Sequence, residues 1–201
     1  MKWADSGGGD FEPAPIGNHI ARCVKVIDLG TQKGEYQGTP LIRRQVTIAW
    51  ELPGELMTEG AGKGKPFLVS KTYTASLSEK ATLRKHLESW RGRAFTADEL
   101  KGFDSKNILM KPCMLSILHT DKGKAQVSGV AAVPKGLEVP GQVNKAVYFS
   151  LEPDEFSLDV YESLGKWHKE TIAQSPEYIH AMRGGEDQGH AFADMTDDIA
   201  F

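Results

Sequence analysis

The chain has 201 residues, a formal net charge of −3 and a hydrophobic fraction of 40%, with 25% charged residues. That apolar share is ordinary for a soluble domain, and no apolar run reaches the ~20 residues that a membrane span needs. The N-terminus has no apolar segment typical of a secretory signal, and Cys23 and Cys113 lie far apart in the sequence, each in an apolar stretch. We therefore expect a cytoplasmic protein with two reduced core cysteines.

Three strands are predicted in the first half of the chain. Residues 19–29 are rich in β-branched side chains, and the strand is expected to end at Gly30. Residues 42–52 alternate apolar and polar side chains, which predicts a half-buried strand ended by Pro53. A third strand is predicted over residues 67–74.

A helix is predicted after the third strand. Ser76 or Ser78 can cap it at Glu79, and Gly92 is expected to end it. Its apolar stripe, at helical spacing, consists of Leu83, Leu87 and Trp90.

The following segment predicts a short second helix and two more strands. Thr96 and Glu99 form a capping-box pattern, with a helix end near Gly102. Residues 112–119 and 124–133 are apolar runs separated by a turn sequence, which indicates a hairpin.

Together these elements predict a mainly β protein. The order β-β-β-α-β-β is that of an OB-fold, a five-stranded Greek-key barrel with an inserted helix, although another small barrel or a sandwich with an inserted helix would give a similar order. We expect four parts along the chain: a flexible N-terminus at 1–15, an OB-fold nucleic-acid-binding domain at 16–156, a helical extension at 157–183 and a disordered acidic tail at 184–201. One or two amphipathic helices, broken near Ser175, are expected in the extension, and Val147 to Leu151 can add a further strand.

No motif in the sequence indicates catalysis, a metal or a cofactor. The glycine-rich loop at 60–65 lacks the spacing of a phosphate-binding loop, and the six histidines show neither an H-x-x-x-H pair nor a cysteine at zinc spacing. Cys113 and His119 could form a nucleophile and base, but their alternation on a predicted core strand favours packing. We expect a protein that is not an enzyme and needs no cofactor.

Charge is distributed unevenly along the chain. Residues 186–201 hold five acidic residues and no Lys or Arg, whereas residues 63–125 carry 13 Lys and Arg against six acidic residues. A basic middle with an acidic tail indicates a surface that binds polyanions and an end that competes for it or binds a partner. The alternative is a tail that only increases solubility.

Binding of single-stranded nucleic acid requires cations along the phosphates and aromatic faces on which bases stack. Lys71 and Tyr73 share one face of a predicted strand and are the preferred stacking pair. Trp90 and Phe95 flank Arg91 and Arg93 in the sequence, but Trp90 shares the helix stripe, so core packing is the favoured interpretation of its position. The candidate DNA-binding residues are Arg43, Arg44, Lys71, Tyr73, Trp90, Arg91, Arg93 and Lys111.

The last eight residues, Asp194-Met195-Thr196-Asp197-Asp198-Ile199-Ala200-Phe201, place acids beside an apolar pair. This end resembles the acidic tip of bacterial single-stranded DNA-binding proteins, which ends Asp-Asp-Ile-Pro-Phe, with Ala200 in place of the proline. In that family the tip docks on replication and repair proteins. The resemblance implies a partner-binding role for Asp197, Asp198, Ile199 and Phe201.

The body has a weaker resemblance, carried by residues 83–104 and by Leu29-Gly30-Thr31-Gln32, to phage-encoded single-stranded DNA-binding proteins. It implies an OB-fold protein, located in the bacterial host cytoplasm, that binds single-stranded DNA without sequence specificity during phage DNA replication, recombination or repair. Host or phage replication and recombination proteins would bind the tip, and a homo-oligomer is compatible with the sequence. Two alternatives stay open: a recombination mediator or annealing protein, and a structural or adaptor protein whose barrel binds protein.

Overall fold

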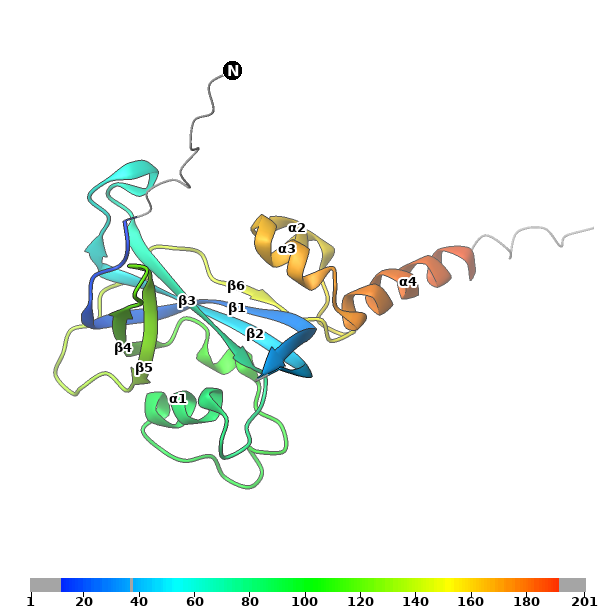
Figure 1. Ribbon diagram of the computed structural model, residues 1–201, viewed down its shortest axis with the longest axis horizontal. Coiled ribbons are helices and arrows are strands. Elements are labelled where there is room, and N and C mark those ends of the chain that lie inside the picture. The colour runs from blue at the N-terminus through cyan, green and yellow to red at the C-terminus, as the bar shows by residue number, and fades with distance from the viewer. Residues whose placement is uncertain (1–11, 37, 192–201) are drawn as a thin grey trace, which may run out of the picture. The chain divides into compact units, whose positions relative to one another are not determined.

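The computed structural model describes residues 12–36 and 38–191, which contain one six-stranded sheet and four α-helices (Figure 1). Neighbouring strands follow the order β3-β2-β1-β4-β5, and β6 pairs with β1 outside this path. The strands are β1 (Gly17–Tyr36), β2 (Thr39–Leu56), β3 (Pro66–Thr74), β4 (Pro112–His119), β5 (Ala125–Ala131) and β6 (Val147–Phe149). The helices are α1 (Thr82–Arg91), α2 (Leu158–Ser163), α3 (Lys166–Ile172) and α4 (Pro176–Ala191), with short 3₁₀ turns η1 (Gly60–Gly62) and η2 (Ser105–Ile108).

The sheet is antiparallel and ends at two edge strands, β3 and β5. Over the residues that the structure describes, no backbone ladder joins these two edges, so the sheet is open. A mainly β protein is therefore confirmed, as is the predicted order of three strands, one helix and two strands. The closed five-stranded barrel of an OB-fold is not confirmed.

Two compact units divide the described chain, and the division cuts across β1, β2 and β3. Unit 1 consists of residues 12–25, 48–71 and 76–146, and unit 2 of residues 26–36, 38–47, 72–75 and 147–191. The first three strands therefore each contribute residues to both units. No boundary between the units falls at residue 156, where the sequence suggested the end of the main domain.

The first two strands are longer than predicted. β1 continues through Gly30 to Tyr36, although Gly30 has a φ of +69°. The Asp28 carboxylate accepts the Gly30 N–H at 2.9 Å, and a Cβ at Gly30 would lie 2.5 Å from Ser175 Cβ, so a glycine is required there. β2 likewise continues through Pro53 to Leu56, so the predicted end at Pro53 was wrong.

Burial of β2 also differs from the prediction. All six residues from Thr47 to Leu52 are buried, so both faces of the strand centre are covered and the half-buried interpretation was wrong there. The alternation nevertheless sorts the core correctly: Ile48, Trp50 and Leu52 are each at most 2% exposed. Sequence alternation predicts which face is apolar but not what covers the polar face.

In unit 1, helix α1 packs on β5 and its predicted stripe is buried (Figure 1). The helix begins at Thr82, three residues later than predicted, because the Ser76 hydroxyl accepts the N–H of Ser78 instead of capping a helix at Glu79. Gly92, in the left-handed conformation at φ 67°, ends the helix as predicted.

The short second helix predicted after Thr96 was wrong. Both capping-box hydrogen bonds form, since Thr96 N–H donates to Glu99 Oε2 at 2.9 Å and Glu99 N–H donates to Thr96 Oγ1 at 3.3 Å. The residues between and after them form turns and no helix. A segment this short, followed by Gly102, gains too few backbone hydrogen bonds to offset helix nucleation.

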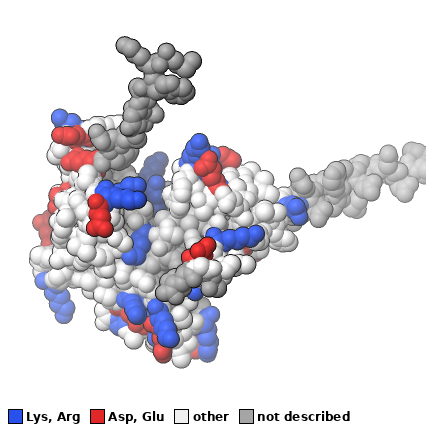
Figure 2. All heavy atoms as spheres, in the orientation of Figure 1, with Lys and Arg blue, Asp and Glu red and all other residues white. Residues whose placement is uncertain are grey.

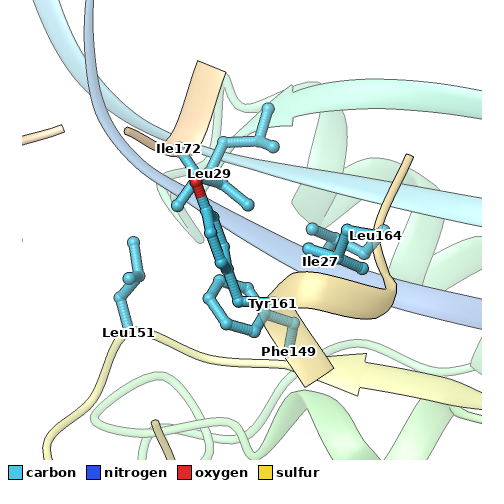
Figure 3. Close-up of a cluster of buried hydrophobic side chains, with 7 residues drawn as sticks. All are labelled: Ile27, Leu29, Phe149, Leu151, Tyr161, Leu164 and Ile172. Carbon is cyan, nitrogen blue, oxygen red and sulfur yellow. The ribbon is translucent and has the colours of Figure 1, made fainter. Parts of the chain in front are cut away.

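Unit 2 has an aromatic core built by β1, β6 and the C-terminal helices (Figure 3). Tyr161 lies against Phe149, with ring centroids 6.1 Å apart, and against Tyr178 at 4.6 Å. The buried members are Ile27, Leu29, Phe149, Leu151, Tyr161, Leu164 and Ile172.

The extension contains three helices where one or two were predicted. The predicted break near Ser175 is confirmed, because α3 ends before it and α4 begins at Pro176. α4 runs to Ala191, beyond Gly184, where the acidic tail was expected to begin. The partner-binding candidates Asp197, Asp198, Ile199 and Phe201 lie outside the described residues, as do residues 1–11 of the predicted flexible N-terminus.

Candidate nucleic-acid interface

The eight candidate DNA-binding residues are divided between the two units. Unit 1 contains Lys71, Trp90, Arg91, Arg93 and Lys111, and unit 2 contains Arg43, Arg44 and Tyr73. Arg91 and Arg93 contact the same residue, Glu99, through its carboxylate.

Trp90 is a core residue. It is 7% exposed, its indole N–H donates to Pro112 O at 2.7 Å, and its ring lies 6.1 Å from that of Trp50. The ring therefore has no free face for a base, as its place on the helix stripe suggested.

Tyr73 is buried at 4% exposure, which leaves its ring no face for a base in this structure. Lys71 is half-buried, and its Nζ donates to the carbonyl oxygen of Val127 at 2.7 Å, so this side chain links β3 to β5. Burial lowers the pKa of the Lys71 ammonium. Both residues share the parity of the buried Phe67 and Val69, a signal that pointed to the core.

Arg44 is held by acids of unit 2. Its guanidinium lies 2.5 Å from Asp28 and 2.8 Å from Glu152, and the hydrogen bond to Asp28 raises the pKa of Arg44. Asp28 also accepts the N–H of Leu151, so this ion pair joins β1, β2 and the segment after β6. Arg44 therefore acts in the structure of unit 2, whereas Arg43 is exposed and makes no ion pair with any described residue.

Arg91 and Arg93 share one carboxylate. Arg93 donates to both oxygens of Glu99, at 2.9 and 2.7 Å, and Arg91 Nη2 donates to Oε1 of the same residue. The hydrogen bond from Arg93, followed by that from the Thr96 N–H, lowers the pKa of Glu99 to about 2. Two cations on one anion leave one positive charge in this cluster.

The cluster borders a pocket of about 370 Å³ in unit 1. Glu99, Phe103 and Asn107 also line this pocket. None of these three was named from the sequence as a candidate binding residue. The spacing of Arg91, Arg93 and Glu99 was visible, but the capping-box interpretation assigned Glu99 to a helix start. No sequence signal indicated that Asn107 would lie there.

The polar side of β2 in unit 1 is covered by the segment before β6. Glu51 is fully buried and its carboxylate accepts the N–H of Val143, the N–H of Asn144 and the Asn144 amide, each at 2.8 Å. Arg22 holds the same segment by donating to Pro140 O at 2.8 Å. This part of the sheet is therefore not open to a nucleic-acid strand in this structure.

The remaining basic residues of unit 1 are mostly exposed and unneutralised. Lys111, the last candidate of this unit, is exposed, and its side chain has no acidic partner in the described chain. The same holds for four lysines in the loops that follow β2 and β4, namely Lys63, Lys65, Lys122 and Lys124.

The two units differ in the sign of their net charge. Within the ranges given above, unit 1 contains 17 Lys and Arg against 11 Asp and Glu, whereas unit 2 up to Arg183 contains six against nine. Figure 2 shows that, on the face drawn, basic side chains stand beside acidic ones and do not merge into one patch. The basic excess is therefore a property of unit 1 as a whole.

Neither cysteine is available for surface chemistry. Cys23 and Cys113 are buried free thiols, as expected. Burial raises the pKa of Cys23 to about 12, and burial together with the neighbouring Cys23 raises that of Cys113. Cys113 is thus unsuited to act as a nucleophile with His119.

Metal-binding clusters and membrane-spanning helices are both absent from the part of the chain that the structure describes. No group of three or more His, Cys, Asp or Glu side chains there is placed to hold a metal ion. No helix there is long and apolar enough to cross a membrane.

No protein-family model matches the sequence of this chain, and no curated protein matches it.

Proposed function

We propose that this protein binds single-stranded DNA without sequence specificity and that unit 1 carries most of the binding. The observation that carries the proposal is the basic excess of unit 1, 17 Lys and Arg against 11 acids, with exposed lysines that have no acidic partner among the described residues. Such lysines can neutralise phosphates without first breaking an ion pair, and release of counterions then drives binding.

The sheet topology supports a single strand as the ligand. The order β3-β2-β1-β4-β5, with a helix between β3 and β4, becomes an OB-fold barrel if the two edge strands meet. The Lys71–Val127 hydrogen bond already connects these edges through a side chain. OB-folds bind oligonucleotides. On the sequence resemblance, we propose that the protein acts in phage replication, recombination or repair.

We assign recruitment of replication or recombination proteins to the C-terminal tip, on the resemblance of its sequence alone. Asp197, Asp198, Ile199 and Phe201 would bind a basic, apolar pocket on the partner. Deleting residues 194–201 is expected to abolish capture of such a partner and to leave DNA binding in place.

The decisive experiment is fluorescence anisotropy of labelled oligo-dT, in competition with duplex of equal length, at two salt concentrations. We expect saturable binding of the single strand, weak competition by duplex, and weaker binding at the higher salt concentration. Binding to duplex with none to the single strand would exclude this function.

A second candidate, a protein-binding adaptor, is favoured by one observation in unit 2. Trp167 is 56% exposed, and exposed tryptophans are frequent anchors of protein interfaces. Unit 2 is acidic, which suits a protein partner better than DNA. No binding of oligo-dT at low salt would favour this adaptor role.

A further inference from the structure

A polar pocket in unit 1 lies between the end of α1 and η2. Its volume is about 370 Å³, and its walls include two arginines, Arg91 and Arg93, two acidic residues, Glu99 and Asp104, and also Phe103 and Asn107. The left-handed Gly92 turns the chain between the two arginines, and both then reach Glu99. The pocket is therefore built by a helix end and the turns that follow it.

Arg91 is fixed in the wall of this pocket but is incompletely bonded. Its guanidinium carbon lies 4.4 Å from the centroid of the Phe95 ring and 5.4 Å from that of Phe103. Nη2 donates to Glu99, whereas Nη1 is buried and has no acceptor among the described residues. A buried donor on a charged group without an acceptor is unfavourable, so this atom indicates a missing partner.

The surroundings favour an anion as that partner. Glu99 is already shared by Arg91 and Arg93, and Arg93 remains 56% exposed on its side chain. Asn107 is exposed, and its side-chain amide has no hydrogen-bond partner among the described residues, so it adds a further donor. At the pocket itself Glu99 and Asp104 balance the charge of the two arginines, whereas residues 91–111 as a whole hold five Lys and Arg against three acids.

We propose that this pocket binds a phosphate group, with Arg91 Nη1, the Arg93 guanidinium and the Asn107 amide as its donors. The proposal rests on the function proposed above, because the phosphate would be one of the strand's own; a free phosphate ion offers the same oxygens. A guanidinium suits a phosphate because its N–H groups match two oxygens at once. The pocket would then fix one point of a bound strand on a surface that otherwise holds it by unspecific charge.

The test uses two exposed positions, because replacing Arg91 could unfold its surroundings. Asn107→Asp places a negative charge at the pocket, and Gln126→Glu is the matched control, with the same charge change on an exposed β5 position of unit 1. We expect oligo-dT affinity to fall at least fivefold in Asn107→Asp and less than twofold in Gln126→Glu. Equal losses of oligo-dT affinity in both variants would overturn the proposal that the pocket binds a phosphate and would leave the proposed function intact.

A second measurement separates the two sources of phosphate. Inorganic phosphate is titrated into the wild-type chain while the side-chain N–H resonances of Arg91 and Arg93 are followed by NMR. We expect both to shift in the wild type, to shift less in Asn107→Asp, and to respond to oligo-dT as well. Shifts with phosphate in a chain that binds no oligo-dT would keep the anion pocket and reject DNA binding.

The remaining outcomes reject the pocket as a phosphate site. No shift of either arginine with phosphate or with oligo-dT would overturn the proposal. Shifts produced only by a carboxylate-rich peptide, and by neither phosphate nor oligo-dT, would overturn it as well, since the pocket would then be a protein-docking site.

Discussion

The two units use their basic residues in different ways. In unit 2, Arg44 is held between Asp28 and Glu152 and joins three segments of the chain. In unit 1, lysines such as Lys111 and Lys124 are exposed and have no acidic partner in the part of the chain that the structure describes. The comparison teaches that the fold decides how much of a basic residue's charge remains for DNA, because Arg44 is neutralised by two acids whereas these lysines are not.

The cores of the two units differ as well. Unit 1 buries both faces of β2 and includes a fully buried carboxylate, Glu51. Unit 2 depends on a small cluster centred on Phe149 and Tyr161. Stability and binding should therefore respond to different substitutions in the two units.

The largest expected effect on stability comes from Phe149→Ala, which would remove the centre of the unit 2 cluster. Emptying a buried aromatic site costs ~3–5 kcal/mol, so we expect a loss of this size in urea unfolding. The matched control is Leu158→Ala, an exposed α2 position that should change stability by less than ~0.5 kcal/mol. If unit 1 carries binding, oligo-dT affinity below the unfolding transition should stay within twofold. A large loss of affinity without unfolding would contradict the assignment.

Glu51→Ala should have the next largest effect, in unit 1. The substitution leaves three donors of Val143 and Asn144 without their acceptor, and we expect a loss of about 3 kcal/mol on urea unfolding. Glu138→Ala, at an exposed position of the same segment, should change stability little. Equal stability of the two variants would show that the buried carboxylate does not hold this segment.

A smaller effect concerns the pH dependence contributed by Glu99. Hydrogen bonds from Arg93, the Thr96 N–H and Arg91 lower its pKa to about 2 in the folded chain. A group with a lowered folded pKa stabilises the fold above its unfolded pKa and loses that contribution as the pH falls through its folded pKa. The difference in melting temperature between wild type and Glu99→Gln should thus be full at pH 7 and shrink between about pH 4.5 and 2. A difference that does not change across this window would show that Glu99 is not ion-paired in solution.

The smallest expected effect is that of a thiol reagent on the native chain, which we expect not to react. Burial raises the pKa of Cys23 to about 12, so almost no thiolate is present at pH 8. A thiol reagent should label neither Cys23 nor Cys113 until urea unfolds the chain. Rapid labelling of the native protein would indicate that the core of unit 1 opens easily.

Local sequence patterns predicted much of the fold. β-Branched runs and alternation located the first five strands, and the stripe at Leu83, Leu87 and Trp90 located α1 and its buried face. Errors arose where tertiary contacts decide the outcome. β1 passes through Gly30 because Asp28 satisfies its N–H, and β2 is buried on its polar face because Glu51 binds a segment some ninety residues away.

The candidate site was predicted less well than the fold. Arg91 and Arg93 line a pocket and Lys111 is exposed, whereas Tyr73 and Trp90 are core residues and Arg44 is held between two acids. Composition cannot tell a paired arginine from a free one, because the pairing acid comes from a distant strand or loop. Parity with Phe67 and Val69 would have assigned Tyr73 to the core.

The most direct test of the difference between the units is charge reversal of equal size in each. Lys111→Glu with Lys124→Glu alters unit 1, and Lys166→Glu with Arg183→Glu alters unit 2, all at exposed positions. For oligo-dT anisotropy over a range of salt, we expect the unit 1 variant to lose at least tenfold in affinity. The slope of log affinity against log salt should fall by up to about 1.4, the value for two lost phosphate contacts. The unit 2 variant should stay within twofold of wild type. An equal or larger loss in the unit 2 variant would contradict the assignment of DNA binding to unit 1.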